Sequence, residues 1–103
     1  MTSAAKTQMN KIRRLLEEAP IAHNHPGGSW GWVSVSEIMR LGIAQHGARL
    51  SELRKLLRGE GREIVNCIHH SDSDGRKHSD YAIMPSVEAR LWRRENGGRA
   101  CHK

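Results

Sequence analysis

Three residues with hydrogen-bonding side chains and one alanine share helical spacing near the middle of the chain: Gln45, Ala48, Arg49 and Glu52. At about 100° per residue they fall on one side of a helix. An arginine can donate two hydrogen bonds to guanine, a glutamine can pair with adenine, and an alanine can contact a thymine methyl. Glu52 can accept from cytosine or orient Arg49 by an ion pair. The pattern fits a helix that contacts base edges, and it also fits an ordinary solvated helix face.

A second group of residues carries hydroxyl, guanidinium or ammonium donors that suit phosphate groups. Three share the same predicted helix and two follow a predicted turn: Ser51, Arg54, Lys55, Arg76 and Lys77. Contacts of this kind add salt-dependent affinity without much sequence information. Asp72 and Asp74 lie in the turn and would repel phosphate, so an ordinary solvated turn is the alternative.

The segment before these residues is predicted to form two helices and a short strand. Apolar residues at three- and four-residue spacing predict a helix over Thr7–Ala19. Trp30–Val33 is aromatic and β-branched, which favours an edge strand. Ser34 or Ser36 can cap a short helix, and Gly42 can end it in the left-handed conformation.

The segment from residue 45 onward is predicted to form a helix, a hairpin and a last helix. Leucines at three- and four-residue spacing make Gln45–Arg58 the strongest helix, and Ile43 before it is expected to fill the core. Residues 62–84 are predicted to form a hairpin, because turn-forming residues lie at 71–75. A basic helix is predicted within residues 85–96.

These elements predict one α+β domain with the plan of a winged helix-turn-helix. In chain order they are helix, strand, helix, helix, strand, strand and helix. The expected boundaries are a flexible N-terminus at 1–6, the winged domain at 7–84, a C-terminal helix at 85–96 and a disordered tail at 97–103. The plan places helix 45–58 in the major groove of DNA and the hairpin beside the backbone.

Composition is consistent with a polyanionic partner. The chain has 103 residues, which suits a single domain, and a formal charge of +6 from 17 basic against 11 acidic residues. A small domain with a pI near 10.0 often contacts nucleic acid. Charge alone does not establish this, because many basic proteins bind no polyanion.

No pattern in the sequence predicts catalysis or a cofactor. There is no Ser-His-Asp order, no glycine-rich phosphate loop and no carboxylate pair on one apolar face. Two groups of residues invite a metal hypothesis, namely the pair His23 and His25, and the hairpin group Cys67, His69, His70 and His78. Neither group has the ligand spacing of a zinc site. We therefore expect no enzyme and no metal.

The sequence favours a cytoplasmic protein. Residues 1–7 lack the apolar core of a signal peptide, and no run of about 18 apolar residues predicts a transmembrane helix. Cys67 and Cys101 are the only cysteines. Two cysteines make no disulfide framework, which fits a reducing compartment.

Two adjoining blocks resemble the helix-turn-helix domains common in phages and prophages: residues 32–40 (WVSVSEIMR) and 42–54 (GIAQHGARLSELR). The likeness extends through residues 61–64, the Asp-Gly-Arg at 74–76 and the strand around Tyr81, and covers roughly residues 8–84. The resemblance implies a small winged domain that binds DNA in a bacterial or phage cytoplasm. It does not choose among repressors, excision factors and replication accessories.

The resemblance also implies roles for individual residues. It places Gln45, Ala48, Arg49 and Glu52 on the recognition face, and Arg76 and Lys77 on the wing. The chain departs from the family in its longer, Asp-rich turn and in its basic C-terminal extension.

We therefore expect a sequence-specific double-stranded DNA-binding protein that regulates transcription in a phage or bacterium without a cofactor. Because one recognition helix contacts a short site, a homodimer is expected. The candidate seam residues on the last helix are Val87, Leu91 and Trp92. The alternative is a small phage protein that uses the same fold to bind and inhibit or modulate a host protein.

Overall fold

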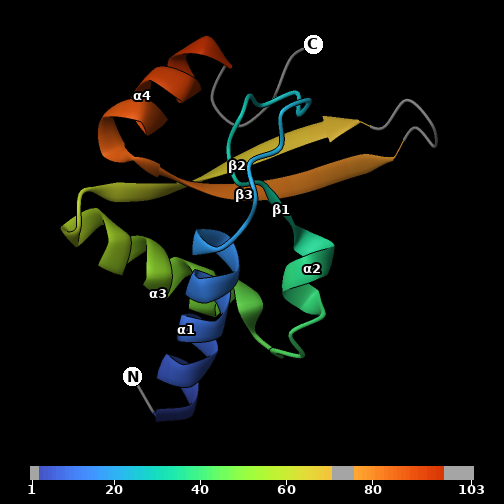
Figure 1. The fold of residues 1–103 in the computed structure, drawn as a ribbon. Coiled ribbons are helices and arrows are strands. Elements are labelled where there is room, and N and C mark those ends of the chain that lie inside the picture. The colour runs from blue at the N-terminus through green and yellow to red at the C-terminus, as the bar shows by residue number, and fades with distance from the viewer. Residues whose placement is uncertain (1–2, 71–75, 97–103) are drawn as a thin grey trace.

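The computed structural model describes residues 3–70 and 76–96, and the statements below refer to these ranges. In chain order the elements are α1 (Ser3–Glu17), β1 (Val33–Ser34), α2 (Val35–Met39), α3 (His46–Gly59), β2 (Arg62–His70), β3 (Lys77–Pro85) and α4 (Ser86–Glu95). The order of helices and strands is the predicted one, and the α+β structure is compatible with a winged helix (Figure 1). The predicted turn residues 71–75 and tail 97–103 lie outside the described residues.

The three strands form one antiparallel sheet in the order β1-β3-β2. β2 and β3 pair along their whole length, from Arg62 opposite Pro85 to His70 opposite Lys77. β1 pairs with only two residues of β3. β3 is therefore the central strand, and β2 forms a long outer edge.

The sheet carries helices on both faces. Figure 1 shows α1, α2 and α3 on one side of the sheet and α4 on the other. Consecutive side chains of a strand point to opposite faces. Accordingly Ile64 packs with the three N-terminal helices, whereas Val65 and Cys67 pack with α4.

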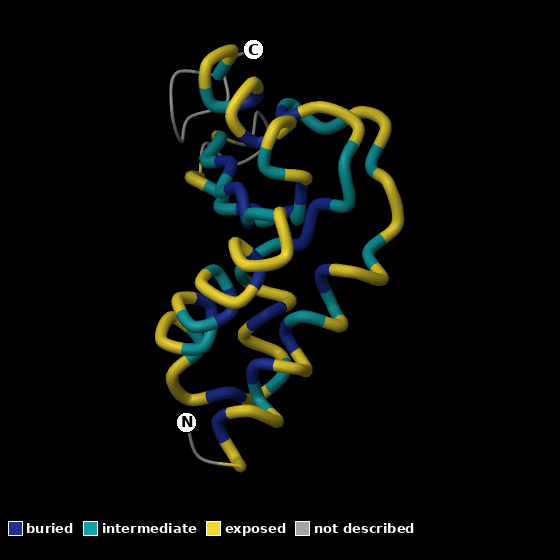
Figure 2. The backbone as a smooth tube through the Cα atoms, turned by 90° about the vertical axis from the view of Figure 1, so that its left-hand side faces the viewer, coloured by how far each residue is buried: buried dark blue, intermediate teal, exposed yellow. Residues whose placement is uncertain are grey.

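The first cluster of buried residues, here called the helical core, fills the space between the sheet and α1, α2 and α3. Its members are aliphatic: Met9, Ile12, Leu16, Val33, Ile38, Ile43, Leu50, Leu53, Leu57 and Ile64. Figure 2 shows buried and exposed stretches alternating along these helices, as expected for helices with one apolar side. The burial of Leu50, Leu53 and Leu57 of α3 and of Ile43 confirms the sequence prediction.

The second cluster, here called the tryptophan core, lies between the sheet and α4. Its members are Trp32, Val65, Cys67, Ala82, Met84, Ala89 and Trp92. The loop before β1 joins this core, because the Trp92 indole N–H donates to the Gly27 carbonyl at 2.8 Å. A Cβ atom at Gly27 would lie 2.5 Å from Cζ2 of Trp32, so the close approach of ring and backbone requires glycine.

The first helix and the first strand differ from their predicted limits. α1 begins at Ser3 rather than Thr7, so residues 3–6 are helical instead of flexible. The buried Ala5 explains this, because it extends the apolar stripe of the helix by one turn. The strand predicted at Trp30–Val33 is shorter and lies later, at β1, while Trp30 forms an isolated bridge with Ala22.

The connection between α2 and α3 follows the predicted turn chemistry. The Ser34 hydroxyl caps α2 by accepting from the Glu37 backbone N–H at 3.2 Å. Gly42 has a φ of 73°, which is the left-handed conformation expected of it. Gln45 then serves as the N-cap of α3, and the first helical residue is His46.

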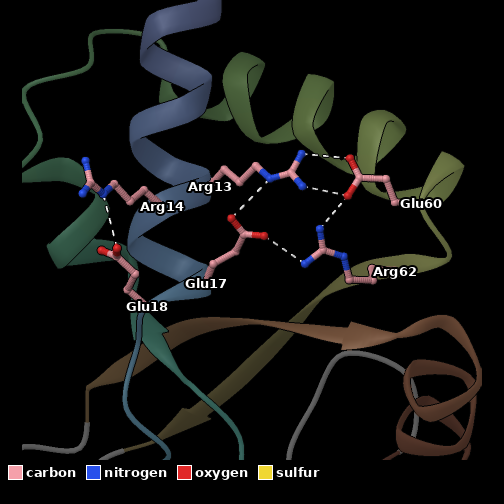
Figure 3. A network of polar contacts seen from close by, with 6 residues as sticks. All are labelled: Arg13, Arg14, Glu17, Glu18, Glu60 and Arg62. Atoms are coloured by element: carbon pink, nitrogen blue, oxygen red, sulfur yellow. Dashed lines mark hydrogen bonds and ion pairs between the residues drawn. The ribbon is translucent and has the colours of Figure 1, made fainter.

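An ionic network joins the end of α1 to the end of α3 and the start of β2 (Figure 3). The Arg13 guanidinium donates to both carboxylate oxygens of Glu60, at 2.9 and 2.7 Å. Arg62 donates to Glu17 at 2.9 Å and also to Glu60. Hydrogen bonds from Arg13 and then from Arg62 lower the pKa of Glu60 from 4.5 to about 2. The network therefore links α1, the C-terminal end of α3 and the start of β2.

Candidate nucleic-acid interface

The solvent-facing side of α3 carries part of the predicted contact set. Gln45, Ala48, Ser51 and Lys55 are exposed, because the buried leucines of α3 occupy the opposite side. Gln45 lies at the N-terminal end of the helix, the end from which side chains reach base edges in helix-turn-helix proteins. It makes no side-chain capping hydrogen bond, so its amide is available to a ligand.

Arg49 is held by the protein rather than presented freely to solvent, which differs from its expected role as a base reader. Its side chain is only 15% exposed and donates to Glu52, which is 31% exposed, at 3.0 Å. The physical reason is spacing, because Arg49 precedes the fully buried Leu53 by four residues and so lies at the border of the core. Of the two roles foreseen for Glu52, the structure contains the ion pair that orients Arg49.

The same ion pair leaves two polar atoms unsatisfied. Arg49 Nε and Glu52 Oε2 are buried and have no hydrogen-bond partner within the described ranges. Such atoms are costly when unpaired. Because both atoms are buried, this cost is borne within the protein and neither atom is exposed to a ligand.

Arg54, a predicted phosphate contact, lies on a different flank of α3. Its guanidinium carbon stands 5.9 Å from the ring centroid of Tyr81 on β3, within cation–π range. This flank faces the sheet, away from Gln45 and Lys55. The structure therefore separates Arg54 from the exposed polar face of the helix.

The predicted wing residues lie at the start of β3, beside the connection between the two strands of the hairpin. Arg76 and Lys77 are both exposed. Lys77 pairs in register with His70 at the end of β2, so both basic residues lie at the far end of the hairpin from α4. The Asp-rich tip between the strands lies outside the described residues.

The structure places the three predicted dimer-seam residues of α4 in different environments. Val87 is 68% and Leu91 is 42% exposed, and the two lie one turn apart on the same side of the helix. Trp92 belongs instead to the tryptophan core, where it is 5% exposed and donates its indole N–H to Gly27. Trp92 cannot meet a second subunit from this position, and this part of the expectation is wrong.

A polar cluster that sequence reasoning missed lies beside the tryptophan core. The Oδ2 atom of Asp80 on β3 lies 2.6 Å from Nε2 of His25 and 2.9 Å from Nε2 of His69. The His25 ring stacks on Trp32 with centroids 4.5 Å apart. Strand alternation would have placed Asp80 on the same face as Ala82 and Met84, but no local signal brings the loop residue His25 to it.

The three side chains of this cluster are of metal-ligand types, and their ligand atoms lie within 4.8 Å of one another. The backbone N–H of Gly27 donates to Nδ1 of His25 at 2.9 Å, so Nδ1 acts as an acceptor. In a neutral imidazole the other nitrogen then carries the proton and donates to Asp80. A metal ligand would need that nitrogen unprotonated, and so the geometry favours a hydrogen-bonded carboxylate over a metal centre.

Comparison of the chain with family models, curated proteins and solved structures found no match. Among the described helices, none combines the length and the apolar character needed to cross a lipid bilayer.

Proposed function

We propose that the protein binds double-stranded DNA in a sequence-specific manner, with α3 in the major groove and the β2–β3 hairpin beside the backbone. The exposed polar face of α3 is the observation that supports this most, since Gln45, Ala48 and Lys55 stand clear of the core. α3 packs against β2, so the helix and the basic hairpin belong to one unit. The net charge of +6 gives the electrostatic attraction that such binding requires.

Within this proposal the residues of α3 have different roles. Gln45 contacts a base through its amide, and Glu52 positions Arg49 as a second donor at the border of the surface. Ser51 and Lys55 contact phosphates, which fixes the register of the helix in the groove. Arg76 and Lys77 add phosphate contacts from the hairpin.

The same proposal includes a homodimer that regulates transcription in a phage or a bacterium. A single recognition helix contacts a short site, and pairing doubles the site. Val87 and Leu91 give α4 an exposed apolar strip through which a second copy can dock. Trp92 supports this helix from beneath rather than entering the interface.

A second candidate function is that of a protein-binding module that modulates a host protein. The exposed apolar side chains of α4 favour it, as does the restrained Arg49, because both are consistent with a surface that meets protein. In that case DNA binding would be weak and blind to sequence.

Selection from random duplexes near physiological salt, followed by sequencing, separates the two candidates. A DNA-binding regulator enriches one motif, and its affinity for that motif falls steeply as salt rises. A protein-binding module enriches no motif. That second outcome would refute the proposed function.

A further inference from the structure

A cavity of about 300 Å³ lies at the outer edge of the sheet, between the second half of α3, β2 and α4. Six of the residues that line it carry polar groups or aromatic rings: Arg54, Arg58, Asn66, Tyr81, Trp92 and Arg93. The cavity reaches the outside along β2, because β2 is an edge strand. None of the six belongs to the exposed polar face of α3 described above.

The positive charges of this cavity are only partly neutralised. Arg54 and Arg58 form no ion pair within the part of the chain that the structure describes, and Arg54 is held against the ring of Tyr81. Arg93 donates to Glu63 at 2.7 Å. Three guanidinium groups against one carboxylate leave two positive charges beside one cavity.

The uncharged polar groups of the wall also act as donors. The Ser79 hydroxyl donates to Oδ1 of Asn66 at 2.8 Å, which leaves the Asn66 amide N–H groups to face a ligand. Trp92 uses its indole N–H on Gly27 and so offers only its ring. A wall with many donors and few acceptors suits an anion with several oxygen atoms, and guanidinium groups match phosphate with two parallel hydrogen bonds.

The pKa of Glu63 indicates a positive electrostatic potential beside the cavity. Its pKa is lowered, first by the hydrogen bond from Arg93 and then by the charges of Arg93, Arg58 and Arg90, against the opposing effect of burial. Several arginines therefore act on one carboxylate. An oxyanion in the adjacent cavity would be stabilised by the same charges.

We propose that this cavity binds the phosphate group of a ligand through Arg54, Arg58 and Arg93. The phosphate is carried either by a small phosphorylated molecule or by a nucleic-acid backbone, and the volume of the cavity suits a compact group. The site lies on the flank of α3 away from Gln45 and Lys55. It is therefore additional to the proposed DNA-reading face and does not depend on it.

An NMR titration of the whole chain with inorganic phosphate, and then with a nucleoside monophosphate, tests the site. We expect saturable shifts of the Asn66 side-chain amide, and binding about tenfold weaker in Arg58→Gln, because one charged hydrogen-bond donor is lost. Glu63→Gln should bind phosphate more tightly, because it removes a negative charge and releases Arg93. Arg94→Gln is the matched control, since Arg94 is exposed on α4 and does not line the cavity.

A second arm uses a random-sequence DNA duplex with the same variants and identifies the source of the phosphate. Saturable binding of free phosphates that weakens in Arg58→Gln supports a small ligand. If Arg58→Gln weakens only duplex binding, and weakens it more than Arg94→Gln does, the phosphate belongs to a nucleic-acid backbone. The proposal is overturned if folded Arg58→Gln and Arg94→Gln behave alike in both arms. Sequence discrimination by Gln45 is measured separately, so this site and the proposed function can fail independently.

Discussion

The two faces of the sheet are held by different kinds of contact. On one face the helical core consists of aliphatic side chains that recur at helical spacing. On the other face the tryptophan core depends on single close contacts, such as Trp92 and Trp32 against Gly27. Asp80 lies between His25 and His69 and adds a specific polar contact to this second face. Substitutions on the first face should therefore destabilise the fold by creating cavities. Those on the second face should destabilise it through steric clashes and lost hydrogen bonds.

Leu53→Ala tests the aliphatic face and should have the largest effect on stability. Leu53 is fully buried at the centre of the helical core, so its truncation leaves a cavity. We expect the free energy of unfolding to fall by about 2–5 kcal/mol, as measured by chemical denaturation. Leu56→Ala, at a leucine that is 42% exposed, is the control and should cost much less. Equal losses for the two leucines would show that the core does not lie where the structure places it.

Gly27→Ala tests the close approach of Gly27 to the Trp32 ring on the opposite face of the sheet. The added methyl group would meet the Trp32 ring, and we expect a loss of about 1–3 kcal/mol in the free energy of unfolding. Gly47→Ala is the matched control, because nothing lies within 4 Å of a Cβ atom there and the residue is helical. That control should gain up to about 1 kcal/mol from helix propensity. A tolerated Gly27→Ala would contradict the close packing of the loop on Trp32.

His25→Ala tests the polar contact of the same face. The change removes a hydrogen bond to the buried Asp80 and a ring stacked on Trp32, and should cost about 1–3 kcal/mol of stability. His23→Ala, in the same loop at an exposed position, is the control and should change little. Metal analysis of the purified protein accompanies the pair. If the wild type holds stoichiometric metal and His25→Ala holds none, the cluster is a metal centre rather than a hydrogen-bonded carboxylate.

Glu60→Gln should have the smallest effect, and only its pH dependence is diagnostic. Because the folded pKa of Glu60 is lowered from 4.5 to about 2, the charged carboxylate stabilises the fold above pH 4.5. That stabilisation is lost as the pH falls from 4.5 through 2. Thermal unfolding across this range should therefore depend less steeply on pH in Glu60→Gln than in the wild type. Parallel pH profiles would show that the network in Figure 3 contributes nothing measurable.

The two faces of the sheet also differ in how far they could be predicted from the sequence. The helical core followed from local periodicity, and the Gly42 turn followed from backbone preference. The cluster around Asp80 did not, because His25 lies 55 residues away in the chain and reaches it only through the folded loop. The partial burial of Arg49 did not follow either, since the helical wheel alone does not show how much of a border residue the core covers.

The proposed function requires that the exposed face of α3 discriminates between DNA sequences. It is tested most directly by the ratio of affinities for the selected duplex and a scrambled duplex, measured for the wild type, Gln45→Ala and the control Gln8→Ala on α1. We predict that Gln45→Ala loses about 1–3 kcal/mol of discrimination, while Gln8→Ala keeps the wild-type ratio. The same ratio in all three proteins, or no preference in the wild type, would contradict the claim.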